Sequence, residues 1–171
     1  MAEMIDLIDA DRVPLGRTVA RGTPLRDGEH VLVVHVCVFN RSGELLIQQR
    51  SAEKSSYPGY WDVSAAGAVR TGEAGREAAV REAREELGIE VTLPDGAAVT
   101  LAFPGGFDDF FLTHADVALA DLTVQAEEVQ AVRWATRDEV RAMLRAGAFA
   151  PYHESFLQLL FDLNRHLGLQ E

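Results

Sequence analysis

Three glutamates in one short segment are the clearest sign of chemistry in this sequence. Glu82, Glu85 and Glu86 are spaced i, i+3 and i+4, so in an α-helix their carboxylates share one face. Like charges at this spacing repel, and each pair costs roughly a few tenths of a kcal/mol. A hard divalent cation such as Mg²⁺ reverses the sign of that cost, because it is bound by carboxylate oxygens. The spacing therefore indicates a metal site on a helix.

A solvated, salt-bridged surface helix would explain the same residues, since Arg81 can pair with Glu77 and with Glu85. For an arbitrary helix rich in Glu and Arg, this is the more common arrangement. The preceding residues 67–73 (GAVRTGE) form a glycine-flanked loop that runs into the helix. Glycines at such a junction let backbone groups approach a ligand or metal closely. We therefore favour the metal site.

The elements around this segment follow from local patterns. A helix is predicted from Gly75 to Leu87, which is rich in Ala, Glu and Arg and is stopped by Gly88. Residues 30–40 (HVLVVHVCVFN) are rich in β-branched side chains and predict a strand. The turn at 40–43 leads into residues 44–49, its predicted antiparallel partner. A short strand is expected near 62–66.

The rest of the chain completes one predicted domain over residues 1–171, with an N-terminal hairpin extension at 1–29. Strands are expected at 4–9, 17–21, 97–103, 110–119 and 129–135, and Asp108-Asp109 is expected to form a turn or, less well supported, a metal ligand. Thr136 is a plausible N-cap for a helix through Arg145. A last helix is expected from His153 to Leu167, with an apolar stripe of Phe156, Leu159, Leu160 and Leu163. Strands and helices intermix without a βαβ rhythm, which predicts an α/β (α+β) sandwich with a mixed sheet between helices.

Composition narrows the class of partner. The net charge of −11 repels nucleic-acid backbones and anionic membranes, yet it is compatible with a small phosphorylated substrate if a metal ion screens the acids. No apolar run approaches the roughly 18 residues of a membrane helix. The N-terminus lacks the pattern of a secretion signal, and the one cysteine, Cys37, forms no internal disulfide. We expect a cytoplasmic protein.

Residues 67–89 resemble the Nudix box, G-x5-E-x7-R-E-U-x-E-E-x-G-U, at every defined position, with Ala83 as the small aliphatic residue U. The resemblance implies a mixed sheet between helices and hydrolysis of a diphosphate linkage. It implies that Glu82, Glu85 and Glu86 bind Mg²⁺, with Mn²⁺ as the alternative. The backbone carbonyl of Ala66 would join them as a further ligand.

Other roles follow from the same resemblance. Arg81 would orient the neighbouring glutamate, while Glu73 and Gly67 would support the loop. The base that takes a proton from the attacking water would be Glu82 or a glutamate in the loop before the last strand, where Glu127-Glu128 lies. An exposed turn explains Glu127 and Glu128 equally well.

Substrate phosphates would be held by Arg50 and Lys54, although a solvated loop explains Lys54 almost as well. His35 and Cys37 alternate with valines on a predicted strand, and we expect buried structural roles for both. The expected partner is a small diphosphate compound, such as a nucleoside di- or triphosphate or a related nucleotide derivative.

Two alternatives remain open. The residues from Arg50 to Asp62 (RSAEKSSYPGYWD) resemble the subgroup related to isopentenyl diphosphate isomerase. In that isomerase, a cysteine precedes the box glycine and a metal-binding histidine follows it, whereas this chain has Ala66 and Ala68 there. Hydrolysis is therefore favoured over isomerisation. A non-catalytic nucleotide-binding module is the second alternative, and it would be favoured by loss of a box acid, but none is lost.

Overall fold

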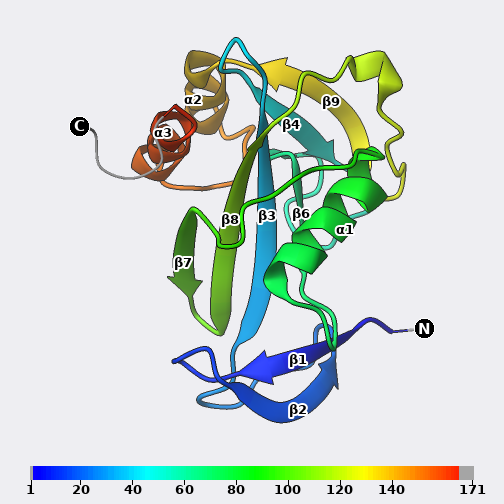
Figure 1. Cartoon of the computed structure of the whole chain (residues 1–171), viewed down its shortest axis with the longest axis vertical. Coiled ribbons are helices and arrows are strands. Elements are labelled where there is room, and N and C mark those ends of the chain that lie inside the picture. The colour runs from blue at the N-terminus through cyan, green and yellow to red at the C-terminus, as the bar shows by residue number, and fades with distance from the viewer. Residues whose placement is uncertain (1, 166–171) are drawn as a thin grey trace.

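The computed structural model describes residues 2–165, which form a mixed β-sheet with helices on both faces and an N-terminal hairpin at one end (Figure 1). The strands are β1 (Met4–Ile8), β2 (Pro14–Ala20), β3 (Val31–Phe39), β4 (Leu45–Arg50), β5 (Trp61–Asp62), β6 (Ala65–Ala68), β7 (Val99–Phe103), β8 (Gly106–His114) and β9 (Val129–Ala135). The helices are α1 (Gly75–Leu87), α2 (Arg137–Arg145) and α3 (Glu154–Leu163), with a 3-10 turn at Leu119–Asp121. The predicted sandwich and N-terminal hairpin are confirmed.

The central strand β3 holds the sheet together. It runs parallel to β8 along its whole length, from the pair Val31–Gly106 to the pair Phe39–His114. Along its other edge it is antiparallel to β6, which covers only part of the strand. The sheet order is β5-β4-β3-β8-β7, with β6 paired to β3 and β9 paired to β4.

The expected hairpin between β3 and β4 is wrong for most of its length. Only Phe39 and Leu45 pair across these strands, and β4 pairs instead with β9 and β5. Ser64 lies where the two strands separate. Its hydroxyl accepts a hydrogen bond from the Val38 N–H at 2.8 Å and donates one to the Leu46 carbonyl at 2.6 Å. A buried side chain thus supplies the bonds that the missing ladder leaves open.

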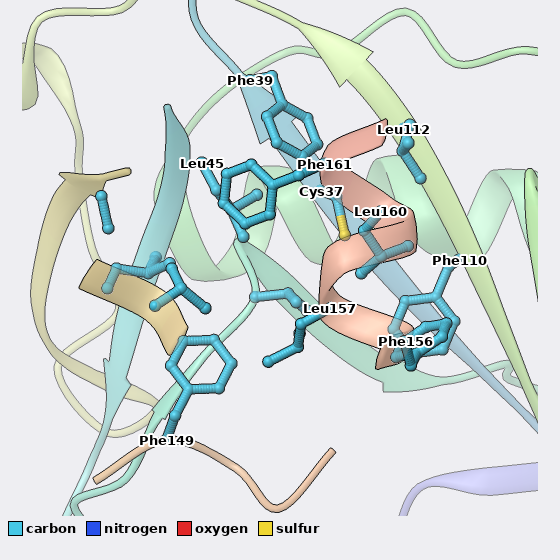
Figure 2. Close-up of a cluster of buried hydrophobic side chains, with 14 of the residues drawn as sticks. Cys37, Phe39, Leu45, Phe110, Leu112, Phe149, Phe156, Leu157, Leu160 and Phe161 are labelled. Atoms are coloured by element: carbon cyan, nitrogen blue, oxygen red, sulfur yellow. The ribbon is translucent and has the colours of Figure 1, made fainter. Parts of the chain in front are cut away.

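Side chains of β3 alternate between two cores, as the period of two requires. Val34, Val36 and Val38 face one core, which includes Ala79 and Ala83 of α1. Cys37 and Phe39 face the other core, which includes residues of α2 and α3 (Figure 2). Cys37 is fully buried there, and burial raises the pKa of its thiol, so the predicted structural role fits.

The last helix differs from its prediction. It ends at Leu163, and residues 166 and 167 of the predicted range lie outside the described residues. Its buried residues are Phe156, Leu157, Leu160 and Phe161. Leu159 is 42% exposed, so its place in the predicted stripe is wrong. Leu157 and Phe161 take the place of Leu159 in the buried face, which packs in one core with side chains of β3, β4 and β8 (Figure 2).

The predicted turn at Asp108-Asp109 is also wrong, because both residues lie inside β8. The strand begins at Gly106, ahead of the predicted start at residue 110, and ends at His114. Each carboxylate has a partner that the local sequence did not reveal. Asp108 bonds His35 at 3.0 Å, and Asp109 accepts from Arg12 and from Thr100.

The N-terminal hairpin is bound to the glycine-flanked loop. Ile5, Leu7 and Val19 form a small core with Ala68. Backbone bonds continue the contact beyond this core: the amide of residue 71 donates to the carbonyl of residue 4 at 3.0 Å, and the amide of residue 72 donates to the Asp6 carboxylate at 2.9 Å. Within residues 2–165, no helix is long and apolar enough to cross a membrane.

We predict that Ser64→Ala lowers the free energy of unfolding by about 1–3 kcal/mol, because it leaves a buried N–H and a buried C=O without partners. Urea unfolding measures the change. Ser42→Ala, at an exposed residue, is the matched control and should change stability little. Equal loss in both variants would contradict a special role for Ser64.

Candidate active site

Helix α1 packs firmly on the sheet, and two of its acids, Glu82 and Glu86, are buried together with its apolar residues. Ala78, Ala79, Ala83 and Leu87 are buried against the sheet. Gly88 ends the helix in the left-handed conformation, and its N–H donates to the Arg84 carbonyl at 3.0 Å. The predicted bounds of this helix are confirmed at both ends.

Arg81 connects the helix to the preceding loop. Its guanidinium donates to Glu73 at 2.7 and 2.9 Å, to Glu82 at 2.6 Å, to Glu85 at 3.2 Å and to the Ala68 carbonyl at 3.0 Å. Burial opposes the charged form of Arg81, but the hydrogen bonds to Glu73 and Glu82 outweigh it and raise the Arg81 pKa. The side chain therefore holds its positive charge beside the acids. These contacts match the positioning roles that the resemblance implied for Arg81 and Glu73.

Glu86 is the most deeply buried of the three acids. Its Oε2 accepts from Gln48 Nε2 at 2.9 Å and from the Ala66 N–H at 3.1 Å. Burial and the nearby charge of Glu82 raise the Glu86 pKa to about 7. The hydrogen bonds from Gln48 and Ala66 lower it, but they offset only part of this increase. Burial likewise raises the pKa of Glu82, although the bond to Arg81 opposes the shift. A bound cation would favour the charged forms of both.

Sequence reasoning missed Gln48. It stands in a strand whose preceding residues 45–47 are all fully buried and apolar, and it is itself 1% exposed. Its Nε2 binds Glu86, while its Oε1 has no hydrogen-bond partner among the described residues. A polar residue that ends a buried apolar run was the available signal, because such a side chain needs a buried partner.

The three glutamates line one cavity of about 250 Å³ together with residues from distant parts of the chain. Its lining consists of Glu3, Arg21, Lys54, Ala66, Arg70, Glu82, Glu85, Glu86, Gln125 and Glu128. Lys54 and Glu128 are ion-paired across it. Glu127 is exposed and lies outside this lining. We call this space the acidic cavity.

Arg50 lies in a neighbouring cavity of about 510 Å³ that shares Ala66 and Arg21 with the first. Its guanidinium lies 3.6 Å from the Asp62 carboxylate and donates to Ser56. The two predicted phosphate-binding residues are therefore separated: Lys54 lines the acidic cavity and Arg50 lines the other.

The donor chemistry of the acidic cavity fits a hard divalent cation, because carboxylate oxygens dominate it. Glu85, however, is bonded to Arg70 at 2.9 and 3.0 Å and to Arg81. Within residues 2–165, no three acidic, histidine or cysteine side chains are gathered as a metal-ligand set. Metal binding would require Glu85 to turn from Arg70 toward its neighbours.

Gly67 makes room for one of these acids. A Cβ at this position would lie 1.9 Å from the Oε1 of Glu82, so a side chain here is incompatible with the observed carboxylate position. The need for glycine arises from a close approach, as the loop pattern indicated.

Comparison with known proteins agrees with this geometry. The NUDIX domain matches residues 29–160. An uncharacterised Nudix hydrolase of Listeria innocua is 46% identical over 92% of this chain and 93% of its own length. An isopentenyl-diphosphate Delta-isomerase of Escherichia coli is 29% identical over 95% of this chain and 91% of its own. The crystal structure of DR0079 from Deinococcus radiodurans superposes with a TM-score of 0.76 and 28% identity, covering 92% of this chain and 97% of that one.

The chain therefore belongs to the Nudix family. It is an enzyme of the pyrophosphohydrolase class, and its reaction is the hydrolysis of a diphosphate linkage.

We predict that Gly67→Ala displaces the Glu82 carboxylate and lowers kcat by about tenfold to a hundredfold, the range seen when groups that orient metal ligands are lost. The change in kcat is measured as the steady-state rate of diphosphate hydrolysis at saturating Mg²⁺. Gly96→Ala is the control, because a Cβ there meets no atom within 4 Å. Full activity in Gly67→Ala would contradict the close approach.

We predict that Glu86→Gln stabilises the metal-free protein at pH 8 but not at pH 5. The Glu86 pKa is raised from 4.5 to about 7 in the folded protein. The folded state therefore binds the Glu86 proton more tightly than the unfolded state does, and the stability that this proton contributes is complete below pH 4.5 and is lost as the pH rises through 7. The glutamine keeps a carbonyl oxygen for Gln48 and Ala66 and carries no charge. Thermal unfolding in a chelator at both pH values measures the difference.

Glu90→Gln is the control for this experiment. Glu90 lies beyond the end of the same helix, is exposed, and is paired with Arg84. It should give no gain at pH 8. A gain of equal size at pH 5 and pH 8 in Glu86→Gln would contradict the assignment of the raised pKa.

Proposed function

We propose that this enzyme hydrolyses the diphosphate linkage of nucleoside di- or triphosphates or related nucleotide derivatives, with Mg²⁺ held by Glu82, Glu85 and Glu86 and with Mn²⁺ as the alternative. The observation that carries the proposal is the acidic cavity, where three glutamates of one helix meet the backbone of Ala66. The carbonyl of Ala66 remains a proposed additional ligand. The residues present match the family motif at each acid.

A bound metal would neutralise phosphate charge and lower the pKa of the attacking water. The chain supplies the remaining functions. Arg81 and Gly67 fix the position of Glu82. Lys54 would bind a substrate phosphate, because its ammonium lines the acidic cavity, where it is ion-paired with Glu128.

We propose Glu128 as the base. It lines the acidic cavity on the loop before β9, across from the helix. Both candidates are ion-paired, Glu128 with Lys54 and Glu82 with Arg81, but Glu82 is in addition one of the three proposed metal ligands. Glu127 is the weaker candidate, since its side chain is exposed and outside the cavity lining.

The residues on either side of the box glycine, Gly67, favour hydrolysis over isomerisation. Ala66 and Ala68 supply neither a thiol nor an imidazole. Cys37 does not replace them, because it is fully buried in the core formed with α2 and α3, and burial raises the pKa of its thiol. The cytoplasmic location stays a prediction.

The test is release of phosphate or pyrophosphate from mixed nucleoside di- and triphosphates with Mg²⁺, with both products measured. We expect release to stop in a chelator and to return with added Mg²⁺ or Mn²⁺. Glu128→Gln should lower kcat by about 10²–10⁴-fold, the usual contribution of a general base. Glu127→Gln is the matched control and should keep its activity.

Electron paramagnetic resonance of added Mn²⁺ separates proton transfer from metal binding, because Glu128→Gln should still bind the ion whereas Glu85→Gln should not. Unchanged kcat in Glu128→Gln together with a loss in Glu82→Gln would assign the base to Glu82. Absence of release from every nucleotide would contradict the proposed substrate class.

A further inference from the structure

The larger cavity beside the acidic cavity has no role in the reaction described so far. Its volume of about 510 Å³ is typical of sites that bind small molecules. It meets the acidic cavity at Ala66 and Arg21, which line both. A substrate whose diphosphate lies at the acidic cavity would therefore have its organic group directed here. We call this space the ring cavity.

One wall of the ring cavity is a chain of polar contacts made of three hydrogen bonds and one ion pair. The His35 Nε2 lies 3.0 Å from an Asp108 oxygen, and its Nδ1 lies 3.4 Å from the Tyr152 hydroxyl. That hydroxyl donates to Asp62 at 2.9 Å, and Asp62 lies 3.6 Å from Arg50. These five residues come from β3, β8, β4, β5 and the segment before α3, yet all line the same space.

The wall is rigid. The imidazole of His35 is stacked on Phe110, with ring centroids 4.3 Å apart and planes 9° apart. Tyr152 packs edge-on against both rings. Burial and the neighbouring Asp62 raise the pKa of Tyr152, so its hydroxyl keeps its proton. The predicted structural role of His35 is therefore incomplete, since this buried residue also faces a cavity.

The lining favours one chemistry of ligand. Asp62 is buried and already accepts hydrogen bonds from Tyr152 and from the Val63 amide. Asp108 is bonded to His35 through one oxygen, and its side chain is 23% exposed, so it keeps capacity to accept from a ligand. A hydrocarbon chain would remove this carboxylate from water without replacing its hydrogen bonds, which costs affinity. A ring with N–H or O–H groups would supply a donor to Asp108, and Tyr57, which is 49% exposed, offers an aromatic face at the same cavity.

We propose that the ring cavity binds the organic group of the substrate, and that Tyr152, His35 and Asp108 select a ring bearing N–H or O–H donors over a hydrocarbon chain. The donors can come from an amino-bearing nucleobase or from sugar hydroxyls. This inference rests on the proposed function, because it assumes that the diphosphate is held at the acidic cavity.

The test is calorimetric binding of non-hydrolysable α,β-methylene diphosphates with Mg²⁺. The probes are the adenosine and inosine pair, the cytidine and uridine pair, and the isopentenyl analogue. We expect every nucleoside analogue to bind at least tenfold more tightly than the isopentenyl analogue. Within each nucleoside pair, tighter binding of the amino-bearing member assigns the donor to the exocyclic amino group. Equal binding assigns it to the groups that both members share, the sugar hydroxyls, or to a ring N–H of inosine or uridine that replaces the amino group; either outcome supports the proposal.

The variants are Tyr152→Phe and Asp108→Asn, each of which should reduce the preference over the isopentenyl analogue to less than threefold. Tyr60→Phe and Asp116→Asn are matched controls outside the ring-cavity lining and should keep the preference. Thermal unfolding checks each variant. If Tyr152→Phe does not fold, Asp108→Asn decides, because the Asp108 side chain is 23% exposed and tolerates an isosteric change more readily.

Equal affinity for nucleoside and isopentenyl analogues would overturn the proposal, as would an unchanged preference in both variants. Hydrolysis of the parent diphosphates is measured separately. Absence of hydrolysis with an intact preference would reject the proposed function and leave the ring cavity in place. Hydrolysis without any preference would reject the ring cavity alone.

Discussion

The acidic cavity depends on one arginine. Positive charge beside the three carboxylates offsets part of their mutual repulsion, and Arg81 supplies it from within the same helix by pairing with Glu82 and Glu85. The planar guanidinium bonds two of the box glutamates, the loop carboxylate of Glu73 and a backbone carbonyl at once. A lysine could not reproduce this fork geometry. The same contacts therefore fix the helix, the loop and the orientation of Glu82 relative to one another.

In this site, protons and positively charged side chains neutralise part of the carboxylate charge that a bound metal would neutralise. Burial and mutual repulsion raise the pKa values of Glu82 and Glu86, whereas Glu85 is exposed enough, and close enough to Arg70, for its pKa to be lowered. The three acids thus have different electrostatic states although their spacing in the sequence is regular. The depth of each side chain below the surface and the partners that it contacts there distinguish them.

Local sequence patterns were sufficient to predict elements whose stability depends on residues close together in the chain. Helix α1 was predicted to the residue, because its propensity, its glycine stop and its motif all agree. The spacing of the three box acids indicated a metal site, and the resemblance to the Nudix box added Arg81 and Gly67; these roles stay predictions. These patterns failed where the position of a residue depends on a partner that is distant in the sequence. The β3–β4 pairing is cut short by Ser64, and Asp108 lies in β8, opposite Val33 of β3, with its carboxylate bonded to His35. The ring cavity could not be found, since its lining comes from segments far apart in the chain. Gln48 left a signal in its buried apolar strand, but its partner Glu86 is 38 positions away.

The bonds between the N-terminal hairpin and the glycine-flanked loop have a consequence for folding. The contact from residue 72 to Asp6 spans 66 positions, and such non-local contacts close late and slowly because their loop entropy must be overcome first. The residues that match the NUDIX domain begin at 29, after the hairpin. The loop that positions the acids is thus completed by a segment outside the matched region. The catalytic loop should reach its final shape only when the first residues of the chain have docked.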